Sequence, residues 1–149
     1  MIRTIRTNSD NPDFIELVKQ LDADLAQRDG EDFSFFAQFN QLDTINHVVV
    51  AYDHETALGC GAIKHYEEKV MEIKRMYTLP SSRGKGVASR VLAELEKWAK
   101  ELAYEKCILE TGIKQPEAIG LYRKSGYRQI PNYGQYAEVE ESQCFEKLI

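Results

Sequence analysis

The stretch IKRMYTLPSSRGKGVA, residues 73–88, decides the fold because it leads from a strand through a short loop into a helix. Residues 70–78 are a compact run of strand-forming side chains, and residues 79–82 are typical of a loop. Apolar side chains then recur at helical spacing from about residue 86 to about residue 102. The stretch therefore predicts a strand–loop–helix unit with glycines at the start of the helix.

The glycine-rich loop favours an anion site. Gly84 and Gly86 let the backbone turn tightly and approach a ligand without a clash at Cβ. The N–H groups at the start of the helix point outward, the helix dipole favours an anion, and Arg83 and Lys85 add positive charge. These residues predict a pyrophosphate cradle, with a plain glycine-rich helix cap as the alternative.

Two familiar phosphate motifs do not fit this loop. A P-loop ends in Gly-Lys-Ser or Gly-Lys-Thr, whereas Gly84 and Lys85 are followed by Gly86. The dinucleotide fingerprint needs three glycines at set spacing inside a βαβ unit, and here the spacing differs and the preceding strands look antiparallel. The predicted cradle is therefore of another kind.

Upstream of the loop, the sequence predicts three antiparallel strands over residues 47–52, 57–66 and 70–78, joined by polar turns. Gly59 and Gly61 interrupt the second of these strands. A glycine inside a strand indicates a bulge or a close approach of another backbone, so we expect one of these here.

The N-terminal part predicts a strand over residues 2–6 and then a helix that ends at Gly30. The helix carries apolar side chains at a spacing of 3.6 residues: Phe14, Leu17, Val18, Leu21 and Leu25. An aromatic cluster follows in a second short helix or a loop: Phe33, Phe35, Phe36 and Phe39. This cluster either packs in the core or forms a wall of a substrate pocket.

Downstream, the sequence predicts a strand over residues 106–110, a helix over residues 117–125, and strands over residues 127–130 and 142–148. Together with the upstream elements, this order is typical of a mixed α/β sheet with helices on its faces. No linker, repeat or low-complexity tract divides the chain, so we expect one domain over residues 1–149.

Composition narrows the function classes. The formal net charge is −5, from 24 acidic and 19 basic residues, and nucleic-acid binders usually carry a basic excess, so we expect no nucleic-acid partner. The three cysteines are widely spaced, and no paired Cys or His spacing indicates a disulfide framework or a metal site. No apolar run approaches the ~20 residues that span a bilayer, and no signal-peptide core is present. We therefore expect a cytoplasmic protein without metal or membrane partners.

Three segments carry a resemblance to a known family. Residues 83–88 fit a pattern of Gln or Arg, two variable residues, Gly, one variable residue, and Gly or Ala. Residues 73–78 look like that family's fourth strand, and residues 121–127 look like its later signature of Leu-Tyr, two or three variable residues, Gly and an aromatic residue. The chain thus resembles the GNAT acetyltransferase superfamily over about residues 47 to 130.

The resemblance implies a fold and a cofactor site. It implies a mostly antiparallel sheet of about seven strands, splayed between the fourth and fifth, with about four helices on its faces. The pantetheine arm of acetyl-CoA would lie in the gap and pair with backbone groups of Met76 and Thr78, and a backbone N–H near Tyr77 would polarise the thioester carbonyl. Gln115 stands where the family usually has Asn, and would reach the same arm. Backbone amides of the loop would hold the pyrophosphate: Arg83, Gly84, Lys85, Gly86, Val87 and Ala88.

The resemblance also implies catalytic residues. Tyr122 matches the tyrosine that protonates the departing CoA thiolate, with a packing role as the alternative. Glu72 lies at the same offset from Arg83 as the base glutamate in one branch of the family, so it is the candidate general base. Glu110, at the mouth of the same gap, is the rival candidate, and a chain of water molecules is a third route for the proton. Strand alternation predicts that Glu72 shares a face with three residues: Lys74, Met76 and Thr78.

The segment Pro131–Tyr136 is unusually aromatic. It is either a plain turn with core tyrosines or a loop over the acceptor pocket. In the second case Tyr133 and Tyr136 would contact the amine by hydrogen bonding or cation–π attraction.

These observations together predict an enzyme that transfers an acetyl group from acetyl-CoA to a primary amine by direct attack. A small amine, a peptide N-terminus and a protein lysine all stay open as acceptors, and so does a homodimer. A non-catalytic acyl-CoA-binding module is the first alternative, against which the presence of Tyr122 argues. A structural or interaction domain without affinity for CoA is the second.

Overall fold

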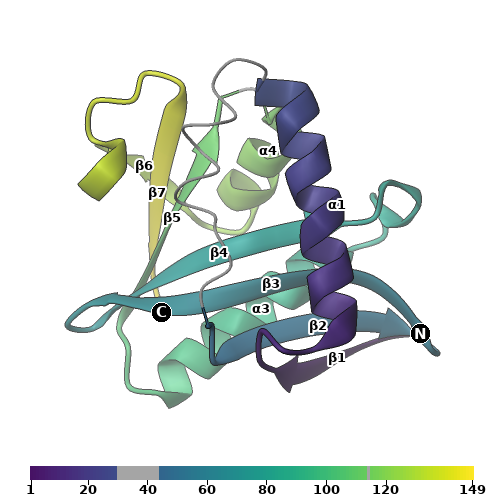
Figure 1. Cartoon of the computed structure of the whole chain (residues 1–149). Coiled ribbons are helices and arrows are strands. Elements are labelled where there is room, and N and C mark those ends of the chain that lie inside the picture. The colour runs from purple at the N-terminus through teal and green to yellow at the C-terminus, as the bar shows by residue number, and fades with distance from the viewer. Residues whose placement is uncertain (30–43, 114) are drawn as a thin grey trace.

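The computed structural model describes residues 1–29, 44–113 and 115–149. Within them, seven strands form one sheet in the order β1-β2-β3-β4-β5-β7-β6 (Figure 1). Neighbouring strands run antiparallel except β4 and β5, which run parallel, so the predicted mixed, mostly antiparallel sheet is confirmed. The strands are β1 (Ile2–Thr7), β2 (His47–Asp53), β3 (Thr56–Glu67), β4 (Val70–Thr78), β5 (Lys106–Gly112), β6 (Arg128–Ile130) and β7 (Ser142–Leu148).

Three α-helices lie within the described residues: α1 (Pro12–Asp29), α3 (Val87–Glu101) and α4 (Pro116–Lys124). Short 3₁₀ turns occur at Pro80–Ser82 and Gly134–Tyr136. About four helices were expected. The second short helix or loop over residues 33–39, and the expected helix end at Gly30, lie outside the described residues.

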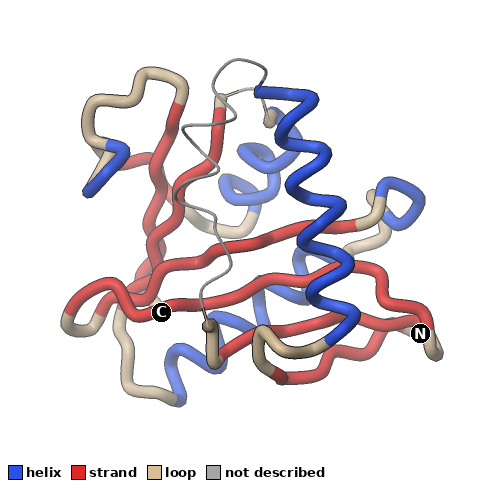
Figure 2. Tube along the Cα trace, in the orientation of Figure 1, coloured by secondary structure: helices blue, strands red, loops and turns tan. Residues whose placement is uncertain are grey.

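The helices cover both faces of the sheet (Figures 1 and 2). α1 packs on β2, β3 and β4, while α3 packs on the opposite face of the same strands, with α4 beside it. Each face has its own apolar core because each helix presents an apolar stripe to the sheet. The α1 core includes Phe14, Leu17, Val48, Val50 and Tyr77, and the α3–α4 core includes Val91, Leu95, Leu109, Tyr122 and Phe145.

The two strand glycines let α3 lie close on β3. A Cβ at Gly61 would lie 2.8 Å from Leu95 Cδ1 and would also clash with the Met76 sulfur. A Cβ at Gly59 would lie 2.7 Å from the carbonyl oxygen of Tyr77. The predicted close backbone approach is found at Gly59, and a bulge lies across from Gly61 on β4. This packing brings the start of α3 beside the end of β4.

β4 and β5 pair only where they begin. Three residue pairs are in register: Val70 with Lys106, Met71 with Cys107 and Glu72 with Ile108. Beyond them β4 continues along β3, while β5 continues along β7. The sheet is thus splayed between its fourth and fifth strands, as the resemblance implied, and it leaves an edge of β4 open to a ligand.

A bulge interrupts β4 at Arg75, whose φ is +60°. The β3–β4 register passes from Ala62 opposite Lys74 to Cys60 opposite Tyr77, so β4 holds one extra residue there. A bulge of this kind re-aims the side chains that follow it, because it breaks the two-residue alternation of a strand.

The expectation that Glu72, Lys74, Met76 and Thr78 share one face of β4 is wrong for this reason. Glu72 and Lys74 lie on the α1 side, where they line a cleft together with Leu21 of α1. Met76 instead packs into the α3–α4 core, and the Thr78 hydroxyl lies beside Gly59 under α3.

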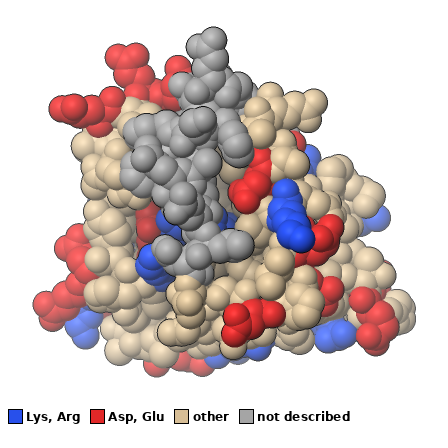
Figure 3. All heavy atoms as spheres, in the orientation of Figure 1, with Lys and Arg blue, Asp and Glu red and all other residues tan. Residues whose placement is uncertain are grey.

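The described residues also bear on disulfides, metal sites and membrane segments, none of which the sequence predicts. Cys60, Cys107 and Cys144 are buried free thiols. In residues 1–29, 44–113 and 115–149, no group of three His, Cys, Asp or Glu side chains is placed to hold a metal ion, and no helix is long and apolar enough to cross a membrane. On the face that carries α1, acidic and basic side chains are interspersed among the described residues (Figure 3).

Candidate active site

The loop after β4 and the start of α3 border a cavity of about 360 Å³, which we call the cradle cavity. α4 forms its other wall. All predicted cofactor residues except Lys85, which is exposed, line it: Met76, Tyr77, Thr78, Arg83, Gly84, Gly86, Val87, Ala88 and Gln115. The structure therefore brings the strand end, the glycine loop and the helix start to one place.

The backbone of the loop is shaped for close contact with a ligand. Gly84 and Gly86 have φ values of +79° and +82°, which L side chains rarely adopt. A Cβ at either position would meet nothing within 4 Å, so both glycines border open space. Gly86 is the N-cap of α3, whose first N–H groups have no partner within the helix. This arrangement fits a pyrophosphate, since donors and the positive end of a helix dipole face the same opening.

Arg83 fastens this loop to the strand before it. Its Nε donates a hydrogen bond to the carbonyl oxygen of Thr78 at 3.1 Å, and its guanidinium lies 5.8 Å from the centre of the Tyr77 ring. The side chain thus holds the loop in register with the end of β4.

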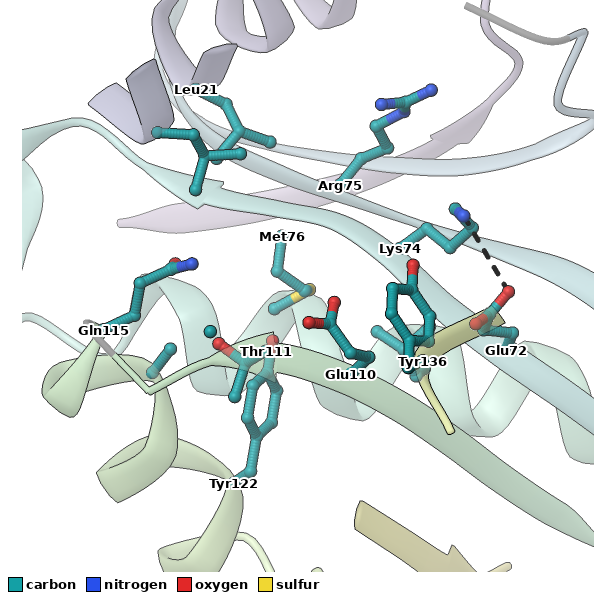
Figure 4. A pocket seen from close by; sticks show the side chains of 14 residues that line it. Leu21, Glu72, Lys74, Arg75, Met76, Glu110, Thr111, Gln115, Tyr122 and Tyr136 are labelled. Carbon is teal, nitrogen blue, oxygen red and sulfur yellow. Dashed lines mark ion pairs between the residues drawn. The ribbon is translucent and has the colours of Figure 1, made fainter. Parts of the chain in front are cut away.

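A second, smaller hollow of about 100 Å³ lies on the α1 side of the splay, and we call it the polar cleft (Figure 4). Charged and hydroxyl-bearing side chains line much of it: Glu72, Lys74, Arg75, Glu110, Thr111, Tyr122 and Tyr136. Five residues line both this cleft and the cradle cavity: Leu21, Met76, Gln115, Ala118 and Tyr122. The two hollows therefore meet at the gap between β4 and β5.

Tyr122 lies at this junction. It projects from α4 toward the cleft, beside Thr111 (Figure 4). Its ring is 5% exposed and packs edge-on against Tyr127 at 5.8 Å and beside Phe145 at 6.3 Å. Burial, and then the charge of Glu110, raise the pKa of the Tyr122 phenol well above its ordinary value. The hydroxyl therefore stays protonated and able to donate at neutral pH.

Glu72 is buried and is held by two neighbours. The Tyr133 hydroxyl donates a hydrogen bond to its Oε2 at 2.7 Å, and Lys74 Nζ lies 3.9 Å from its Oε1. Burial and the Glu72 charge raise the pKa of Tyr133, which therefore remains a donor. Tyr133 thus supports Glu72 from outside the polar cleft, while Tyr136 lines the cleft itself.

Glu110 lies two residues beyond the last β5 residue that pairs with β4, and so within the open part of the splay. The Ser142 hydroxyl donates a hydrogen bond to its Oε2 at 2.7 Å. Figure 4 shows its carboxylate between Tyr122 and Tyr136, on the floor of the cleft. The pKa of Tyr136 is raised, first by burial and then by the charges of Glu110 and Glu72.

The segment before β7 is fixed by hydrogen bonds and ring contacts. Asn132 Nδ2 donates to the carbonyl oxygens of Val139 and Ser142 at 3.0 and 2.9 Å. The rings of Tyr133 and Tyr136 meet edge-on at 5.9 Å. This packing places the Tyr136 side chain over the carboxylates of the cleft.

Sequence reasoning missed Arg75, Thr111 and Ser142, and it treated Lys74 only as a neighbour of Glu72. Arg75 and Lys74 stand within the deciding stretch, but nothing in its residue types signals the bulge that turns Arg75 into the cleft beside Lys74. Ser142 reaches Glu110 from β7, 32 residues away, so only the strand pairing reveals it.

The model of the acetyltransferase (GNAT) family matches residues 10–127. The chain belongs to this family. An IAA acetyltransferase of Azospirillum brasilense is 35% identical over 102 residues, which are 68% of this chain and 67% of that protein. The uncharacterized N-acetyltransferase YjgM of Escherichia coli is 30% identical over 135 residues, which are 83% and 80% of the two chains.

A solved structure shares the whole fold. The Klebsiella pneumoniae protein, provisionally described as an acyl-CoA N-acyltransferase, superposes with a TM-score of 0.82 at 30% identity. The match covers 99% of this chain and 97% of that one. The similarity thus extends over nearly the whole of both chains.

Proposed function

We propose that this member of the GNAT family transfers an acetyl group from acetyl-CoA to a primary amine by direct attack. The observation that carries the proposal is the meeting of the cradle cavity and the polar cleft at Tyr122. One hollow offers helix N–H groups and glycines to a pyrophosphate, and the other offers carboxylates to an amine. The acyl-CoA in the description of the Klebsiella neighbour supports the same donor.

Acetyl-CoA would lie with its pyrophosphate on the loop from Arg83 to Ala88 and its pantetheine arm along the open edge of β4. Backbone groups of Met76 and Thr78 would pair with that arm, as an added strand pairs with a sheet edge. Gln115, which lines both hollows, is placed to contact the same arm. The thioester would then reach the junction beside Tyr122.

The transfer needs a neutral amine and a protonated leaving group. The amine nitrogen forms a bond to the thioester carbon, the carbon–sulfur bond breaks, and the sulfur takes the phenolic proton of Tyr122. The nitrogen loses its extra proton to a carboxylate of the cleft, and a proton returned through that carboxylate or solvent restores the Tyr122 phenol. Burial raises the pKa of Tyr122, and it raises the pKa of the buried Cys60 thiol to about 12. A CoA thiolate enclosed in the same way would also become more basic. The pKa of the CoA thiol would therefore rise together with the pKa of the Tyr122 phenol.

Two carboxylates can take the proton of the amine, and Glu110 is the better placed. Its charge acts on Tyr122, and it lies in the open part of the splay. Glu72 lies at the closed end, where Tyr133 and Lys74 already engage both of its oxygens. In this arrangement Tyr133 and Ser142 position the two carboxylates, and Tyr136 lines the path of the amine.

The proposal is tested with a panel of primary amines incubated with acetyl-CoA. Thiol release and the mass of the acetylated product are the measurements. We expect release that depends on both the amine and the protein, with one acetyl group added to the amine. Thermal stabilisation by acetyl-CoA without transfer to any amine would contradict the proposed catalysis and leave an acyl-CoA-binding module.

A further inference from the structure

The polar cleft contains cations as well as carboxylates, and this mixture bears on the acceptor. Building on the proposed function, we propose that the acceptor is a small zwitterion: a primary amine that also carries a carboxylate, phosphonate or other oxyanion. Its amine would lie beside Glu110, and its anionic group beside Lys74 and Arg75. The peptide N-terminus and protein lysine are thereby disfavoured as acceptors.

The bulge in β4 is the structural basis of this arrangement. Lys74 and Arg75 are consecutive, and in a regular strand they would point to opposite faces. The positive φ of Arg75 and the extra residue in β4 instead let both side chains line the polar cleft. A non-glycine residue in this backbone region is uncommon and strained, and such residues gather at functional sites.

The charged side chains of the cleft are buried, so their charges act strongly on a ligand that enters it. Arg75 is 6% exposed, and the side chains of Lys74 and Glu72 are 12% and 9% exposed. Among the described residues, the lining contains two cations and two carboxylates, Lys74 and Arg75 with Glu72 and Glu110. An amine without an anionic group would find partners only in the carboxylates, whereas a zwitterion would find an opposite charge for each of its two groups.

The order of the side chains along the cleft gives the zwitterion a direction. Tyr122 and Gln115, which also line the cradle cavity, lie at one end, Glu110 lies in the middle, and Lys74 lies at the other end beside Glu72, while Arg75 lies above them with its guanidinium directed away from the carboxylates (Figure 4). An amine beside Glu110 therefore faces the thioester, while the anion points away from it. Burial lowers the pKa of Lys74 against the opposing effect of Glu72, and an anionic ligand beside it would raise that pKa again.

The experiment uses matched acceptor pairs that differ only in the anion: α- and ω-amino acids with their amides, and aminoalkylphosphonates with the corresponding amino alcohols. At saturating acetyl-CoA, we expect kcat/KM at least about 10-fold higher for one or more anionic members than for their neutral partners. Lys74→Gln should raise KM for the anionic member about 10-fold and leave KM for the neutral member within about twofold. Arg75→Asn, a residue that tolerates positive φ, should act in the same way, and Arg75→Lys should retain part of the preference.

Lys97→Gln is the matched control, because it removes one exposed cation from α3 on the opposite face. It should leave both acceptors unchanged. Thermal stabilisation of wild type by each pair, in the presence of CoA, gives a second readout that needs no turnover, and only the anionic members should raise Tm. Neutral amines that serve as well as their anionic partners, or equal effects of Lys74→Gln on both, would overturn the zwitterion proposal while leaving the transferase intact. Failure of every anionic member to raise Tm above its neutral partner would overturn it as well.

Discussion

Tyr122 and Glu110 illustrate how burial sets chemistry at individual positions. Tyr122 is enclosed by apolar rings, so its phenol keeps its proton, and the nearby Glu110 charge strengthens this effect. Glu110 in turn accepts a hydrogen bond from Ser142 and stays directed into the cleft. A fixed proton donor and a fixed carboxylate thus lie on the two sides of the expected reaction centre.

Tyr122→Phe should lower kcat by about 10²–10⁴-fold, because the phenolic proton is needed only as the thiolate leaves. The affinity for acetyl-CoA should change little, which calorimetry can measure beside turnover. Tyr127→Phe is the matched control: it also removes a buried hydroxyl, but one that donates to Glu96 outside both hollows. Wild-type turnover in Tyr122→Phe would assign this tyrosine to packing.

Glu110→Gln should lower kcat/KM mostly at low pH. A protonated amine cannot attack, so a base must remove its proton there, whereas at high pH the amine arrives neutral and the defect shrinks. Glu72→Gln, measured beside it, should show the smaller change at low pH, because Glu72 is engaged by Tyr133 and Lys74. Profiles of both variants that run parallel to wild type would leave a water chain or a pre-deprotonated amine as the route.

Among the elements, the fit of α3 against β3 determines where the cradle lies. Gly61 has no room for a Cβ beside Leu95 and Met76, and Met76 borders both hollows. Crowding at this point would push α3, whose first turn holds the cradle, away from the end of β4.

Gly61→Ala should therefore lower the free energy of unfolding by about 1–3 kcal/mol, the usual cost of overpacking a core. Gly120→Ala is the opposite case, since this exposed glycine of α4 has no atom within 4 Å of an added Cβ. Helix propensity predicts a gain of up to about 1 kcal/mol for that variant. Urea unfolding of the two proteins measures the difference, and equal stabilities would contradict the close approach.

The elements themselves could be predicted from the sequence because their signals are local. The apolar stripe of α3, the β-branched run of β2 and the glycines of the cradle all appear within single segments. The bulge at Arg75 could not be predicted, since an arginine with positive φ has no sequence signature and is imposed by the surrounding sheet. For that reason the predicted face of β4 was wrong, and the contacts of Glu72 with Tyr133 and of Glu110 with Ser142 became visible only in three dimensions.

At the scale of the whole molecule, the cradle cavity and the polar cleft both lie at the gap where β4 and β5 separate. β4 and β5 separate after three paired residues, and the opening is bordered by α1 on one face and by α3 and α4 on the other. In the proposed reaction the donor occupies the cradle cavity, which α1, α3 and α4 border, and the acceptor occupies the polar cleft. We propose that the glycine loop at this opening binds acetyl-CoA.

Calorimetric titration of acetyl-CoA into wild type and Gly86→Asp tests this claim most directly, with Gly86→Ala as the control for backbone strain at φ +82°. We expect wild type to bind, Gly86→Ala to bind more weakly, and Gly86→Asp to lose at least about 10-fold more affinity than Gly86→Ala, because its carboxylate would repel the pyrophosphate. Circular dichroism establishes that both variants are folded. Equal affinity of wild type and Gly86→Asp for acetyl-CoA would contradict the account.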